Sequence, residues 1–163
     1  MTTGVLFVHA TAWLAFAAYV GGSLIGLRTP ASLRFRCVWL TGALLLLVHL
    51  LAAFHFIHGW SHAAAYADTA RQTREVTGLD WGGGVYFNYA LAALWLADAG
   101  IQLAAPGRLP RQARVALAGF YAFMWFNAAV VFVHNPVRWV GAAAFASLAW
   151  RKWHPTSGGP VHR

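Results

Sequence analysis

The chain has 163 residues, of which 60% are hydrophobic and only 10% charged, and its formal net charge is +8. A globule of this size leaves roughly a third of its surface exposed, so this composition excludes an ordinary soluble domain and indicates a polytopic membrane protein. The basic residues stand in short clusters between apolar runs, which excludes nucleic acid as a partner and predicts the lipid bilayer as the surroundings.

Apolar stretches long enough to cross a membrane occur four times, since a transmembrane helix needs about 20 residues. They cover residues 4–27, 37–58, 84–105 and 113–134. A fifth stretch, 135–151, is shorter, at roughly 25 Å as a helix. The sequence therefore predicts an all-α integral membrane protein with five spans, or with four spans and one interfacial helix. Residues 1–153 are expected to form one transmembrane domain and 154–163 a flexible tail.

The basic clusters predict how the chain is oriented, because cytoplasmic loops are enriched in Lys and Arg. With five spans, all three strongly basic segments fall on one side of the membrane. They contain Arg28, Arg34 and Arg36; Arg108, Arg111 and Arg114; and Arg151, Lys152 and Arg163. We therefore expect a cell-membrane protein with its N-terminus outside and its C-terminus in the cytoplasm.

The segment after the second span is predicted to form an extracytoplasmic helix. Ser61 can cap a helix over residues 62–77, and Gly78 is a suitable C-cap. The second span either continues outward into this helix or bends near Gly59 into a separate, interfacial one.

Three histidines close together in this region predict a metal site. His55, His58 and His62 occupy a sector about 60° wide if the helix is continuous. Imidazole-rich sites suit copper, iron or zinc, and the shell can be completed by His9 or His134 and by a carboxylate from Asp68, Glu75 or Asp80. Polar groups at membrane depth are functional candidates. The leading hypothesis is thus a membrane metalloprotein with this site at its extracytoplasmic face, acting as a redox enzyme or an electron carrier.

Other polar residues support an alternative with haem b. His9 and His134 are predicted at similar depth on different spans and would suit a bis-histidine pair, while His49 lies near the midplane. Arg138 would pair with a haem propionate or act as an interface anchor. The alternative function is therefore a single-haem b-type cytochrome, or a haem-bearing subunit of a respiratory complex.

A third hypothesis assigns no chemistry to the histidines. At helix ends such side chains often bond only to water and lipid phosphate. The chain would then be a non-catalytic accessory subunit in a larger membrane complex or a homo-oligomer.

Asp98 stands near the inner end of the third span, where a carboxylate costs less than the about 2.5–3.5 kcal/mol of the bilayer centre. It can accept a proton or pair with an inner arginine, but we favour a role in helix packing. The aromatic residues Trp95, Phe123, Trp125 and Phe126 are expected in the core.

Overall fold

The computed structural model describes residues 2–30, 32–133 and 136–154. Its helices are α1 (Thr3–Arg28), α2 (Leu33–Phe56), α3 (His62–Thr77), α4 (Gly84–Ala104), α5 (Arg111–Phe126), the π-helix η1 (Asn127–Val131) and α6 (Arg138–Trp153). No strand occurs within the described ranges, so the all-α prediction is confirmed there. The expected tail from 155 onward lies outside the described residues.

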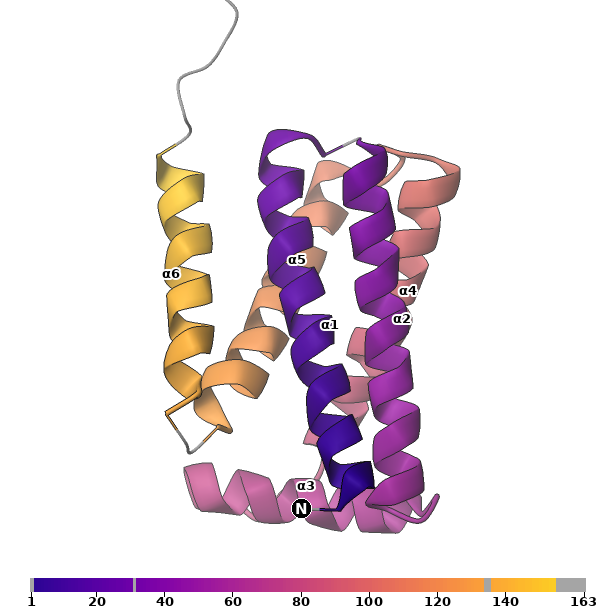
Figure 1. Ribbon diagram of the computed structural model, residues 1–163, viewed down its shortest axis with the longest axis vertical. Coiled ribbons are helices and arrows are strands. Elements are labelled where there is room, and N and C mark those ends of the chain that lie inside the picture. The colour runs from indigo at the N-terminus through magenta and orange to yellow at the C-terminus, as the bar shows by residue number, and fades with distance from the viewer. Residues whose placement is uncertain (1, 31, 134–135, 155–163) are drawn as a thin grey trace, which may run out of the picture.

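α1, α2, α4 and α6 run roughly lengthwise, α5 runs obliquely between them, and α3 lies across one end of this bundle (Figure 1). α1 packs along α2, α2 packs against α4, and α6 contacts η1 and α1. Within the described ranges, three helical stretches are long and apolar enough to cross a membrane: Thr3–Arg28, Leu33–Phe56 and Arg111–Val131. α4 has 21 residues, whereas α6 has only 16.

The two ends of the bundle differ in charge. We call the end opposite α3 the basic end, and the end that α3 crosses the α3 end (Figure 1). Among the described residues, eight cations lie at the basic end: Arg28, Arg34, Arg36, Arg108, Arg111, Arg114, Arg151 and Lys152.

Two of the predicted spans differ from the observed helices, one at its start and one near its end. α2 begins at Leu33, earlier than the expected residue 37, because the Ser32 hydroxyl accepts a hydrogen bond from the Phe35 amide at 3.2 Å. That cap places two arginines inside the first turns of the helix. The fourth stretch leaves α-geometry at Asn127, where the Phe132 amide donates to the Asn127 carbonyl in a π-helical bond of 3.0 Å.

The core of the bundle is aromatic. Trp95 of α4 is fully buried, and Trp39 and Trp125 pack against it with ring centroids 5.3 Å and 5.8 Å away. Gly42 of α2 permits this approach, because a Cβ there would lie 2.6 Å from Cζ2 of Trp95. Two of the four predicted core aromatics, Trp95 and Trp125, are therefore confirmed.

The other two were predicted wrongly. Phe123 is 58% exposed and Phe126 is 41% exposed on the described chain. The buried face of α5 instead follows the helical period through Tyr121, Met124 and Trp125, and the two phenylalanines fall on the opposite side.

The second span bends into a separate helix rather than continuing outward. α2 ends at Phe56, and Gly59 and Trp60 both have positive φ, at 55° and 60°. The Ser61 hydroxyl then accepts from the Ala64 amide at 3.2 Å, and Gly78, at φ 79°, caps the other end. Both predicted caps of α3 are confirmed.

Candidate functional site

The break between α2 and α3 separates the histidines expected on one helical face. His55 lies on the last turn of α2, exposed, with its ring against Phe56 at a centroid distance of 4.6 Å. His58 lies in the connection and packs against Phe54 at 5.7 Å. The continuous-helix geometry is therefore wrong, because α2 ends at Phe56 and two positive-φ residues, Gly59 and Trp60, separate His58 from His62.

His62 begins α3 and meets a different helix. Its Nδ1 lies 3.0 Å from the Tyr89 hydroxyl and its Nε2 lies 3.3 Å from the Tyr86 hydroxyl, both on α4. The imidazole is thus hydrogen-bonded on both nitrogens and fastens α3 to the start of α4.

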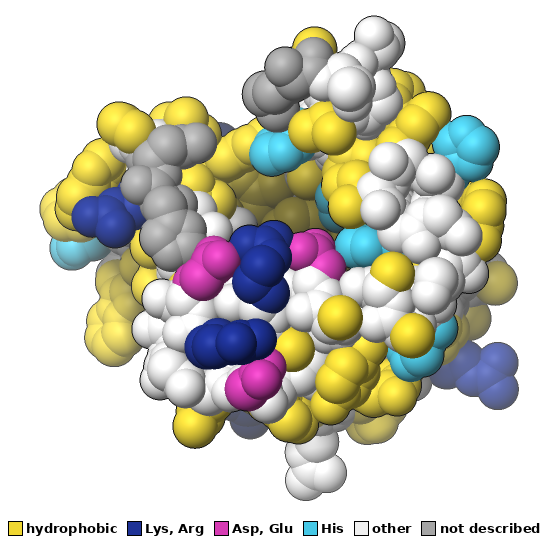
Figure 2. Space-filling view, turned by 90° about the horizontal axis from the view of Figure 1, so that it is seen from below, with side chains coloured by type: hydrophobic (Ala, Val, Ile, Leu, Met, Phe, Trp, Pro, Cys, Tyr) yellow, Lys and Arg dark blue, Asp and Glu magenta, His cyan; other side chains and the backbone are white. Residues whose placement is uncertain are grey.

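The carboxylates predicted as metal ligands are paired with arginine on the outer face of α3. Arg71 donates to Asp68 at 2.6 Å and to Glu75 at 2.7 Å, and these bonds raise the pKa of its guanidinium. Arg74 donates to Asp80 at 3.1 Å. The five charges gather on the face that α3 turns away from the bundle, with apolar side chains around them (Figure 2).

His49 is bonded to the neighbouring helix. Its Nδ1–H donates to the Val8 carbonyl of α1 at 3.0 Å, and the same carbonyl accepts from the Thr11 hydroxyl at 2.9 Å. This contact gives the half-buried imidazole a structural partner between α1 and α2.

Two of the remaining predicted cofactor residues lie within the described part of the chain. His9 is exposed on α1, and His134 lies outside the described residues. Arg138 begins α6 and its guanidinium stacks over the Trp139 ring at 4.9 Å; its roles as a propionate partner or an interface anchor stay predictions.

Across the described ranges, no three His, Cys, Asp or Glu side chains form a group able to hold a metal ion. Copper, iron or zinc at His55, His58 and His62, and haem b at His9 and His134, stay predictions.

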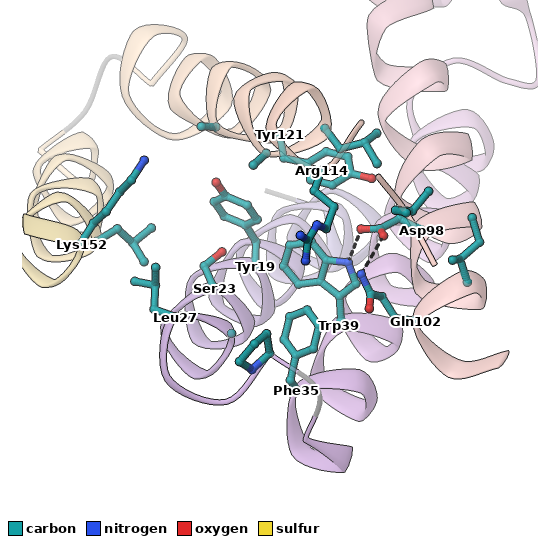
Figure 3. Close-up of a pocket in the computed structure, with 18 of the residues that line it drawn as sticks. Tyr19, Ser23, Leu27, Phe35, Trp39, Asp98, Gln102, Arg114, Tyr121 and Lys152 are labelled. Carbon is teal, nitrogen blue, oxygen red and sulfur yellow. Dashed lines mark hydrogen bonds between the residues drawn. The ribbon is translucent and has the colours of Figure 1, made fainter. Parts of the chain in front are cut away.

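A pocket opens instead at the basic end. It has a volume of about 600 Å³ and lies between the start of α2 and the parts of α1, α4, α5 and α6 that are nearest the basic end (Figure 3). Aromatic and aliphatic side chains form most of its wall, including Phe35, Leu117, Phe145 and Leu148. Its size is within the range of small-molecule sites, which are about 300–1,000 Å³.

The Asp98 carboxylate lines this pocket and is held by two donors. Asp98 is only 7% exposed; its Oδ2 accepts from the Trp39 indole at 2.8 Å and its Oδ1 accepts from Gln102 at 3.2 Å (Figure 3). The Trp39 bond joins α2 to α4 across 59 residues of chain. The favoured prediction for Asp98, a role in helix packing, agrees with this contact.

Tyr121 supplies a polar group without a partner. It is 2% exposed, and among the described residues its buried hydroxyl has no hydrogen-bond partner. Its hydroxyl points toward the helix that carries Asp98 (Figure 3). A buried hydroxyl left unpaired costs about 1–3 kcal/mol, so a bound molecule with a polar atom there would recover that cost.

Two cations complete the pocket. Arg114 of α5 and Lys152 of α6 line it from different helices (Figure 3). Within the described part of the chain, all ion pairs lie at the α3 end, so neither cation is paired with a carboxylate there.

The sequence pattern pointed to Asp98. It did not predict that Trp39, Tyr121, Arg114 and Lys152 line the same pocket. The one available signal was that a lone carboxylate in an apolar span needs donors from other helices. Comparison with known protein families, curated proteins and solved structures finds no match for this chain.

Proposed function

We propose that the chain is a five-span membrane protein, with α1, α2, α4, α5–η1 and α6 crossing the bilayer and α3 lying at the outer interface. Three of these stretches have the required length and hydropathy. Large apolar side chains such as Leu44, Leu47 and Leu51 of α2 are exposed on the bundle, where acyl chains would cover them. The eight cations of the basic end favour the cytoplasmic side for that end.

We further propose that the protein binds a small amphipathic molecule in the pocket of the basic end. The observation that carries this proposal is the unpartnered Tyr121 hydroxyl, buried beside the pocket into which the hydrogen-bonded Asp98 carboxylate also faces. Natural cores rarely leave a buried hydroxyl unpaired. The Tyr121 hydroxyl and the Asp98 carboxylate are therefore suited to hydrogen bonds with a bound ligand.

The geometry gives each wall a role. Phe35, Trp39 and Phe145 enclose apolar or aromatic parts of the ligand. Tyr121 donates to an acceptor on it, while Trp39 and Gln102 fix the Asp98 carboxylate in place to accept from a ligand donor. No chemical transformation is required, so the proposed activity is binding, as in a carrier or a sensor.

A pair of alanines on α5 provides the test. Ala118 lines the pocket, whereas the exposed Ala116 faces the opposite side of the helix. The neutral fluorophore 6-propionyl-2-dimethylaminonaphthalene, titrated into protein in phosphatidylcholine nanodiscs, should show saturable, protein-dependent binding. Ala118→Phe fills the cavity and should abolish this binding; Ala116→Phe should not.

Equal binding by both variants, or no saturable binding by the wild type, would overturn the proposal. Matching circular dichroism spectra of the two variants serve as the control for folding.

A further inference from the structure

We infer that the ligand of this pocket is an amphipathic anion, an acyl or similar apolar chain ending in a phosphate or carboxylate, with the charged head held between Arg114 and Lys152. This inference rests on the proposed function, because it names the chemical class of the molecule bound in the same pocket.

The charge of the pocket is the first observation. Its lining contains one carboxylate, Asp98, and two cations, Arg114 and Lys152. Asp98 already accepts hydrogen bonds from Trp39 and Gln102, whereas the two cations have no carboxylate partner among the described residues. The unsatisfied charge of the pocket is therefore positive.

The position of the two cations is the second observation. Arg114 lies in the first turns of α5, and Lys152 lies in the last turn of α6. Tyr121 is seven residues further along α5 than Arg114, about 10 Å deeper at 1.5 Å per residue. Arg114 and Lys152 therefore start nearer the basic end than Tyr121 does.

This order suits a molecule with one charged end. Guanidinium and ammonium groups bind phosphate and carboxylate through charge-assisted hydrogen bonds. The apolar chain would then lie along Phe145, Leu148 and Leu117, and a hydroxyl or carbonyl group on it would reach Tyr121. An anionic head cannot occupy the inner region, where Asp98 would repel it, so the two ends of the ligand are distinguished.

The charges around the pocket are also positive. Arg28, Arg34, Arg36, Arg108, Arg111 and Arg151 lie at the same end of the bundle. A cluster of one sign raises the local concentration of oppositely charged molecules and of anionic lipids near the membrane surface. An organic cation would have to pass this cluster to reach Asp98.

The test compares three dodecyl compounds of equal chain length, titrated into the protein in phosphatidylcholine nanodiscs and followed by displacement of the neutral fluorophore. Dodecyl phosphate should bind about tenfold or more tightly than dodecanol, and dodecyltrimethylammonium should bind more weakly than both. Inorganic phosphate should not displace the fluorophore, because it has no chain to occupy the apolar wall.

Charge-matched variants isolate the two cations. The double variant Arg114→Gln with Lys152→Gln should lose the preference for dodecyl phosphate while it keeps dodecanol binding. Arg108→Gln with Arg111→Gln removes the same charge at exposed positions that do not line the pocket and should keep the preference. Arg114→Lys should retain most of it.

A second arm distinguishes a free amphiphile from a bilayer lipid of the same chemistry. Phosphatidylglycerol added to the nanodiscs weakens apparent dodecyl phosphate binding if the lipid itself occupies the pocket, and leaves it unchanged if the ligand is a free amphiphile. Either result supports an amphipathic anion.

Equal affinities for dodecyl phosphate and dodecanol, or a preference for the ammonium compound, would overturn the inference and leave the proposed function standing. Absence of fluorophore binding, or its persistence in Ala118→Phe, removes the proposed function itself.

Discussion

Asp98 shows how one polar residue serves two purposes in the half of the bundle that is nearest the basic end. Its carboxylate is buried and joins α2 to α4 through the Trp39 indole at 2.8 Å. At the same time it faces a pocket in which Tyr121 has no partner. A single carboxylate therefore serves both the packing of the helices and the polarity of the proposed binding site.

Removing this carboxylate should destabilise the fold measurably. Asp98→Ala leaves the buried Trp39 N–H without an acceptor, and we expect a loss of about 1–3 kcal/mol of unfolding free energy. Asp98→Asn retains an acceptor oxygen and should cost less. Chemical unfolding in neutral detergent, followed by circular dichroism, measures both.

A double-mutant cycle assigns the cost to the hydrogen bond. In a Trp39→Phe background, which keeps the aromatic wall, Asp98→Ala should cost clearly less than in the wild type. An unchanged cost would show that the carboxylate stabilises the bundle through other groups.

The histidines show why a pattern of polar residues did not predict their partners. His62 bonds to two tyrosines of α4, and His49 bonds to a backbone carbonyl of α1. Spacing along one helix predicts which rings share a face, but these partners come from other helices.

Elemental analysis and an absorption spectrum of the purified protein test the metal and haem predictions. Bound metal that is lost in both His58→Ala and His62→Ala would establish a metal site.

Among the helices, α6 forms one wall of the pocket. Its position is set by a close contact between Gly141 and the backbone of η1. A Cβ on Gly141 would lie 2.6 Å from the carbonyl oxygen of Ala129 in η1. Because that atom belongs to the backbone, it cannot move aside as a side chain would. The glycine thus sets the distance between α6 and the π-helical segment.

Gly141→Ala should therefore displace α6 and weaken both the fold and the pocket. We expect a loss of about 1–3 kcal/mol, typical of overpacking, together with weaker binding of the neutral fluorophore. Gly119→Ala is the matched control on α5, since nothing lies within 4 Å of its added Cβ. It should be neutral or stabilising, because alanine favours helix over glycine by about 1 kcal/mol. Equal thermal shifts for the two variants would contradict this account of α6.

The helices themselves were largely predictable from the sequence. The stretches 4–27 and 84–105 match α1 and α4 closely, and the Ser61 and Gly78 caps bound α3 as expected. Local chemistry decides these features: long apolar runs, a hydroxyl before the first turn, and a glycine able to adopt positive φ. The bend after Phe56 remained open between two alternatives, because a single Gly59 is compatible with both.

At the scale of the whole molecule, the pocket was not predictable in the same way. Its lining comes from five helices, and only Asp98 was conspicuous in the sequence. Trp39 and Tyr121 look like ordinary membrane aromatics until the fold brings one to the carboxylate and leaves the other unpaired. The charge asymmetry between the two ends, in contrast, is visible in the sequence and agrees with the arrangement of the helices.

Thiol accessibility at Ala118 tests the central claim, a pocket open to the cytoplasm at the basic end of a five-span bundle. In a Cys37→Ser background, Ala118→Cys should react with a membrane-impermeant thiol reagent in inside-out vesicles and not in right-side-out vesicles. Ala116→Cys, facing lipid, should react in neither. Reaction of Ala118→Cys only in right-side-out vesicles, or equal reactivity of the two positions, would contradict the account.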